Sequence, residues 1–226
     1  DGYNTAVGYE AGLLVTTGIS NVLIGGLAGD ALTDADNNVG VGKNAIGSDT
    51  LGSKSTAVGH GSLAVQNFTS ATDTYNTAVG YHAGVAVTTG TSNTFVGGLA
   101  GDGTDDGVGN TAVGYNSLSA NAANYNVAIG HESLVVCTGT NNTSVGVVAG
   151  SSLTSGSNNI FIGRDAGVTG SPAGNQTTGS NSICLGDENI GDAYIQVDWT
   201  VASDQRDKTD FTALDLGLDF VKALAP

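Results

Sequence analysis

The sequence predicts an all-β fold, a parallel β-solenoid of about eleven coils of 16–17 residues. A six-residue motif, clearest as NTAVGY at residues 76–81, recurs with variations from near the first residue to about residue 186. The 226 residues include 36 glycines, yet 39% are hydrophobic. The β-branched residues also stand at fixed places in the motif. This combination favours ordered strands with glycine corners over disorder.

The glycine that closes each motif marks one coil. Most successive markers are 16 or 17 residues apart, whereas the steps into Gly80 and Gly186 span 21 and 23 residues. Residues 3–18 return nearly unchanged at 75–90, which indicates duplication of a four-coil block. The markers are Gly8, Gly25, Gly42, Gly59, Gly80, Gly97, Gly114, Gly130, Gly146, Gly163 and Gly186.

The three residues before each marker predict a short strand. Val79 represents a column that is aliphatic throughout, and Thr77 represents a column in which every member is β-branched. Residues two apart share one side of a strand, so we expect these columns to stack into ladders that fill the coil. Ala78, between them, belongs to a column that points the other way.

This second column predicts a contact between chains. Where its residue is alanine, Tyr or His usually follows the marker; where it is Leu23 or Phe95, glycine follows. Such an exchange indicates that both side chains fill one confined volume, and a narrow coil has only one interior. We therefore expect this face to be buried against other copies of the chain. The candidate interface residues are Ala6, Tyr9, Ala78, Tyr81, Phe95, Ala112, Tyr115 and Phe161.

Corners and loops complete each coil. The asparagine that opens most motifs predicts a corner, because asparagine tolerates left-handed φ, and its repetition predicts a structural ladder. Longer steps place loops at 66–75 and 168–180. These loops and the acidic segments 30–36 and 102–106 are candidate recognition surfaces, since loops on a rigid scaffold often carry binding residues.

Charge and composition exclude several classes of function. The net charge of −15, with three basic residues before position 200, predicts no nucleic-acid partner. No apolar run is long enough to span a bilayer, so we expect no membrane insertion. Cys137 and Cys184 are expected to be buried free thiols. No metal, cofactor or catalytic motif stands in the repeats, so we expect no cofactor and no enzymatic activity there.

The repeat pattern stops at Asp187. We expect a repeat domain at 1–192 and a second part at 193–226, a short α/β segment with a connecting strand at 193–201 and a short helix at 214–224. Because Asp1 opens directly into a repeat, the chain is expected to be a piece of a longer protein.

The C-terminal residues 203–226, which read SDQRDKTD followed by LDLGLDFV and LAP, resemble the start of the C-terminal intramolecular chaperone of endosialidase-type phage tailspikes and fibres. The resemblance implies that Ser203 is the nucleophile and cleavage point of self-cleavage, with Lys208 as its base. A desolvated lysine can take up the serine proton. Whether the present chain cleaves itself stays open, since it is too short to hold the whole chaperone.

The repeats at 4–167 resemble the N-x-V-A-I-G coils of YadA-like trimeric adhesin heads and of many phage tail fibres, although the period here is longer. The resemblance implies a left-handed, homotrimeric β-roll. It implies a virion tail fibre, an extracellular protein whose partners are two further copies of itself and a host cell-surface receptor, with a glycan among the candidates.

Two alternatives remain open. The first is the head of a bacterial trimeric autotransporter adhesin at the cell surface, which would require a stalk and membrane anchor downstream. The second is a carbohydrate-cleaving tailspike, which would need paired carboxylates in a cleft. Spacing alone does not bring the aspartates of the acidic segments together.

Overall fold

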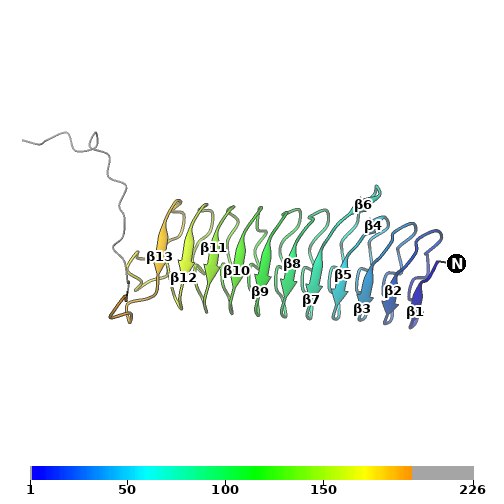
Figure 1. Cartoon of the computed structure of the whole chain (residues 1–226), viewed down its shortest axis with the longest axis horizontal. Coiled ribbons are helices and arrows are strands. Elements are labelled where there is room, and N and C mark those ends of the chain that lie inside the picture. The colour runs from blue at the N-terminus through cyan, green and yellow to red at the C-terminus, as the bar shows by residue number, and fades with distance from the viewer. Residues whose placement is uncertain (1, 195–226) are drawn as a thin grey trace, which may run out of the picture. The chain divides into compact units, whose positions relative to one another are not determined.

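A computed structural model describes residues 2–194, and over this range the protein is a parallel β-solenoid without helices. Eleven three-residue strands, one in each coil, form one parallel sheet in chain order (Figure 1). The prediction of an all-β solenoid is confirmed. The strands are β1 (Thr5–Val7), β2 (Val22–Ile24), β3 (Val39–Val41), β5 (Thr56–Val58), β7 (Thr77–Val79), β8 (Thr94–Val96), β9 (Thr111–Val113), β10 (Val127–Ile129), β11 (Thr143–Val145), β12 (Ile160–Ile162) and β13 (Ile183–Leu185).

Two further strands, β4 (Gly52–Ser53) and β6 (Thr72–Asp73), pair with each other in a small second sheet. The chain divides into two units, Asp1–Gly191 and Asp192–Pro226, and all but the first three residues of the second lie outside the described range. The solenoid is the first. The expected strand at 193–201 and helix at 214–224 fall almost entirely outside the described residues.

The strands stack without any shift in register. Thr77 pairs with Thr94, Ala78 with Phe95 and Val79 with Val96, and the same pattern runs through the sheet. Each marker glycine follows its strand at strongly positive φ, for example 144° at Gly80. A Cβ atom built on Gly80 would lie 2.3 Å from the Gly97 carbonyl oxygen. Only glycine therefore fits this column, because the backbones of adjacent coils touch there.

The side of the strand that faces the coil interior is the reverse of the one predicted. Ala78, Phe95, Ala112 and Phe161 are fully buried within the single chain. Val79 is 37% exposed, and the other residues of its column are half-buried or exposed. The alternation of sides was correct, but the β-branched columns line the outside and the middle column fills the core. The prediction that Ala78, Phe95, Ala112 and Phe161 contact another chain is therefore wrong.

The interior is packed by an exchange between the middle strand residue and the residue four positions after the marker. Coils with Ala57, Ala112 or Ala128 carry a buried leucine at that second position: Leu63, Leu118 and Leu134. Coils with Leu23, Phe95 or Phe161 carry glycine there: Gly29, Gly101 and Gly167. A Cβ atom on Gly101 would lie 2.5 Å from the Phe95 ring, so large and small residues share one volume.

The two phenylalanines also extend into the preceding coil. A Cβ atom on Gly84 would meet Phe95 Cδ2 at 2.8 Å, and one on Gly150 would meet Phe161 Cδ2 at 2.8 Å. The coil before each phenylalanine therefore has small residues at both interior positions, and one ring fills space in two coils.

A ladder of buried asparagines links successive coils. Asn93 N–H donates to Asn76 Oδ1 at 2.9 Å, and Asn93 Oδ1 accepts Asn110 N–H at 2.9 Å. Asn93 Nδ2 donates to the Gly107 carbonyl oxygen at 2.8 Å. The structural ladder is confirmed. The left-handed corner lies one residue earlier than predicted, as at Ser92 (φ 60°).

The ladder has a substitution at Ser55, beside the loop at 66–75. Gln66 Nε2 donates to Ser55 Oγ at 2.9 Å, and Asn76 Nδ2 donates to Gln66 Oε1 at 2.9 Å. The buried Asp49 carboxylate accepts the Phe68 and Gly52 N–H groups, each at 3.0 Å. Gln66, the first residue of the inserted loop, is thus buried in the coil and makes hydrogen bonds in place of the missing asparagine side chain.

Candidate functional site

The largest candidate site is the outward face of the eleven-stranded sheet. Each strand of this sheet presents two side chains there, and from β2 to β13 they stand on either side of a buried middle residue. The column before the markers is entirely aliphatic and includes exposed Ile24, Val79, Val96, Ile129, Val145, Ile162 and Leu185. With strands about 4.8 Å apart, these residues form a continuous apolar strip about 50 Å long.

Exposed tyrosines stand on both sides of this strip. Tyr81 and Tyr115 follow marker glycines, whereas Tyr75 and Tyr125 precede the asparagines, and all four are more than half exposed. Tyrosine is enriched at protein interfaces because it combines a large apolar ring with a polar tip. Together the strip and its tyrosines have the composition of an interface between chains.

Histidines extend the tyrosine column that follows the markers. His60 stacks on Tyr81 with ring centroids 5.5 Å apart, and Tyr81 stacks on His82 at 4.0 Å. In a later pair of coils Tyr115 stacks on His131 at 5.4 Å. These contacts order the rings along the edge of the outward face.

The predicted interface residues therefore separate into two groups. Tyr9, Tyr81 and Tyr115 lie on the surface beside the apolar strip, and Ala6 is exposed in the first described coil. The other four are core residues. Tyr81 and Ala78 do not share a volume, because Ala78 is buried while Tyr81 is 57% exposed. Sequence reasoning missed the exposed valine and isoleucine column, since an aliphatic ladder was assigned to the coil interior.

The loops and acidic segments make contacts that hold neighbouring coils together. Asp36 Oδ1 accepts the Ile19 N–H at 2.7 Å, and Thr88 Oγ1 donates to Asp105 Oδ1. The loop at 168–180 is mostly exposed, but Ser171 within it is buried, and its Oγ accepts the Gly167 N–H at 3.2 Å. These segments are partly structural.

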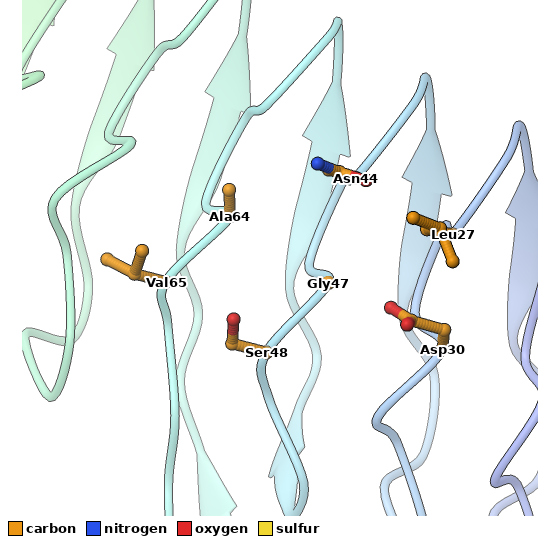
Figure 2. A pocket seen from close by; sticks show the side chains of 7 residues that line it. All are labelled: Leu27, Asp30, Asn44, Gly47, Ser48, Ala64 and Val65. Atoms are coloured by element: carbon orange, nitrogen blue, oxygen red, sulfur yellow. The ribbon is translucent and has the colours of Figure 1, made fainter.

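A small open pocket lies on the segments that follow β2, β3 and β5. It has a volume of about 330 Å³. Figure 2 shows its seven lining residues in front of the strands, on three neighbouring coils. They are Leu27, Asp30, Asn44, Gly47, Ser48, Ala64 and Val65. Burial raises the pKa of the Asp30 carboxyl above its ordinary value, and the charge of Glu10 adds to this, against a lowering by a backbone hydrogen bond.

Several predicted features need separate mention. Ser203 and Lys208 lie outside the described residues. Cys137 and Cys184 are buried free thiols, as expected. Within residues 2–194 no three His, Cys, Asp or Glu side chains are grouped so that they could hold a metal ion.

The same part of the chain contains no helix long and apolar enough to cross a membrane. A comparison with known protein families, curated proteins and solved structures found no match for the chain.

Proposed function

We propose that this chain is a homotrimeric shaft or head of a phage tail fibre that binds a receptor on the host cell surface. The observation that carries the proposal is the unpaired apolar face of the sheet. Soluble monomers rarely expose a large contiguous apolar surface, so this strip favours burial against other chains.

Two further copies of the same chain suit this face. The outward face of the sheet repeats the same two columns in every coil, so an identical chain offers a face of the same length and spacing. The tyrosines at its edges suit the rim of such a contact. Closure of three sheets around one axis would bury all three strips and leave the remaining sides free.

The C-terminal sequence supports a phage fibre over a bacterial adhesin. Residues 203–208 read SDQRDK, which resembles the start of a self-cleaving chaperone that assists trimer formation. In this proposal the solenoid persists in the virion, and the chaperone is removed after assembly, with cleavage at Ser203.

Sedimentation velocity tests the assembly. The 226-residue chain is expected to sediment as a trimer, and Val96→Asp should dissociate it, because three carboxylates would enter an apolar contact. Val136→Asp is the matched control, since Val136 is exposed but lies away from the outward face of the sheet. A folded wild-type monomer, or equal dissociation by both variants, would refute this interface.

A longer chain with the complete chaperone tests the maturation step. Mass spectrometry should find a cut beside Ser203 in the wild type and an uncut chain in Ser203→Ala. An uncut wild-type chain would show that the resemblance does not extend to cleavage.

A further inference from the structure

The column of residues that follow the marker glycines has two gaps, at Gly26 and Gly98. Neither of these glycines is held at a left-handed φ. A Cβ atom on Gly98 would meet nothing closer than Tyr115 Cδ2 at 3.7 Å, and one on Gly26 would meet only the Tyr9 carbonyl oxygen at 3.9 Å. Both are ordinary contact distances, so the fold accepts a side chain at either position.

The gap at Gly98 separates two exposed tyrosines. Tyr81, Gly98 and Tyr115 hold the same place in three adjacent coils, those of β7, β8 and β9 (Figure 1). Tyr81 is 57% exposed and Tyr115 is 52% exposed. Neighbouring strands lie about 4.8 Å apart, so the two tyrosines stand about 9.6 Å apart along the sheet, with no side chain of their column between them. This space, bounded by Tyr81 and Tyr115, is the Gly98 slot.

Histidines cover the other face of each tyrosine. His60, one coil before Tyr81, stacks on it with ring centroids 5.5 Å apart, and His131, one coil after Tyr115, stacks on it at 5.4 Å. His82 also stacks on Tyr81 and leans toward the earlier coil, since a Cβ atom on the glycine after His60 would lie 2.6 Å from its Cδ2 atom. The faces directed toward the Gly98 slot have no aromatic partner among the described residues. The column is thus a stack of rings with one place missing.

The surroundings of the Gly98 slot are acidic. Between Lys54 and Arg164 the sequence contains no lysine or arginine, but it contains five carboxylate residues, Asp73, Asp102, Asp105, Asp106 and Glu132. The face of an aromatic ring attracts a cation within about 6 Å of its centroid, and a group midway in the slot lies within that range of both tyrosines. A positively charged ligand is therefore favoured, and an anionic one is disfavoured.

We propose that the Gly98 slot binds the guanidinium group of an arginine side chain on a host receptor protein, stacked between Tyr81 and Tyr115. Guanidinium is planar, stacks on aromatic faces and is weakly hydrated, whereas the ammonium group of lysine is compact and strongly hydrated. A flat cation therefore suits a space bounded by two rings.

The Gly98 slot would give the recognition role proposed above its chemistry, and it rests on that role for its purpose. The two tyrosines stand at the edge of the outward face, at the rim of the proposed contact between chains. The rim of an interface stays accessible to solvent, so the slot can be occupied in the trimer.

The other gap differs in one of its walls. Gly26 stands between Tyr9 and the exposed Lys43, so a cation replaces one of the two rings. The ammonium group of Lys43 repels a second positive charge, and the Gly26 gap should therefore not bind arginine. The chain thus contains an internal comparison for the Gly98 slot.

Saturation-transfer difference NMR with the 226-residue protein tests the slot, using an acetylated and amidated Gly-Arg-Gly peptide and the same peptide with citrulline, the uncharged isostere of arginine. The arginine peptide should bind, and the citrulline peptide should bind at least about fivefold more weakly. Gly98→Tyr should abolish binding, because a ring of the chain itself fills the slot while the net charge stays the same. Tyr81→Leu and Tyr115→Leu should each weaken binding about two- to fivefold, because one cation–π contact is lost.

Variants of the other gap provide the matched controls. Gly26→Tyr and Tyr9→Leu should leave binding unchanged. No binding of the arginine peptide, equal binding of the two peptides, or equal losses in Gly98→Tyr and Gly26→Tyr would overturn the proposal. Sedimentation velocity on the same samples separates the slot from the assembly. A trimer without peptide binding would refute the slot alone, and a monomer that binds the peptide would refute the trimer alone.

Discussion

Substitution of Asn93 by alanine tests how much the asparagine ladder contributes to stability. The change removes the acceptor of the Asn110 N–H and the donor to the Gly107 carbonyl, and both of those residues are buried. Each unpaired group costs about 1–3 kcal/mol, so unfolding should become easier by about 2–6 kcal/mol. Urea denaturation followed by circular dichroism, at one fixed protein concentration, measures this loss.

Asn4→Ala is the matched control. Asn4 makes corresponding bonds, to the Gly18 carbonyl at 2.7 Å and from the Asn21 N–H at 2.8 Å, but its side chain is exposed. Water can replace it, so the loss should stay near 0.5–1.5 kcal/mol, the ordinary net value of about one hydrogen bond. Hydrogen exchange of the Asn110 amide should accelerate in Asn93→Ala only. A loss in Asn93→Ala no larger than that in Asn4→Ala would refute the reasoning.

Three further predictions concern packing and ionisation. Phe95→Ala should lower the free energy of unfolding by about 3–5 kcal/mol in the same assay, because it empties a fully buried site. A smaller loss than that caused by Val96→Ala would instead mean that the Val96 side of the strand faces the core. The hydrogen bond from Lys54 lowers the pKa of Asp73. The stability that this pair adds to the fold is therefore present above the usual aspartate pKa of about 3.9 and is lost as pH falls through the lowered pKa. NMR titration should show a higher Asp73 pKa in Lys54→Met, and an unchanged value would contradict the pairing. Burial raises the pKa of the Cys137 thiol; native protein should label slowly with iodoacetamide at neutral pH, and rapid labelling located there by mass spectrometry would contradict its burial.

The regular features of the solenoid were predictable because they repeat. Marker spacing gave the coil length, and the glycine column follows from contact between adjacent backbones. The sidedness of the strand was not decided by alternation, because the pattern Thr77-Ala78-Val79 fits either orientation. Hydrophobicity pointed to the wrong side, since an aliphatic column on the outside of one chain resembles a core.

A stronger signal for sidedness was present in the sequence. Phe95 and Gly101 exchange size with Ala112 and Leu118 across six residues within a coil. That comparison places the middle column inside. The exchange with the residue after the marker, such as Tyr81, is a weaker guide, because that residue lies on the surface.

The pocket was not predictable from composition or motif. Its lining residues come from three coils, and the sequence alone does not show that they face one open space.

The phenylalanine that fills two coils limits how such a chain can change its length during evolution. Loss of the coil that carries β7 would place Leu63 where Gly84 now makes room for Phe95, and the two side chains would collide. Loss of the coil that carries β9 would instead bring Ala128 and Leu134 into the places of Ala112 and Leu118, with no change in volume. Gains and losses in related chains should therefore keep each phenylalanine coil together with the coil before it, so that this pair is inherited as one unit.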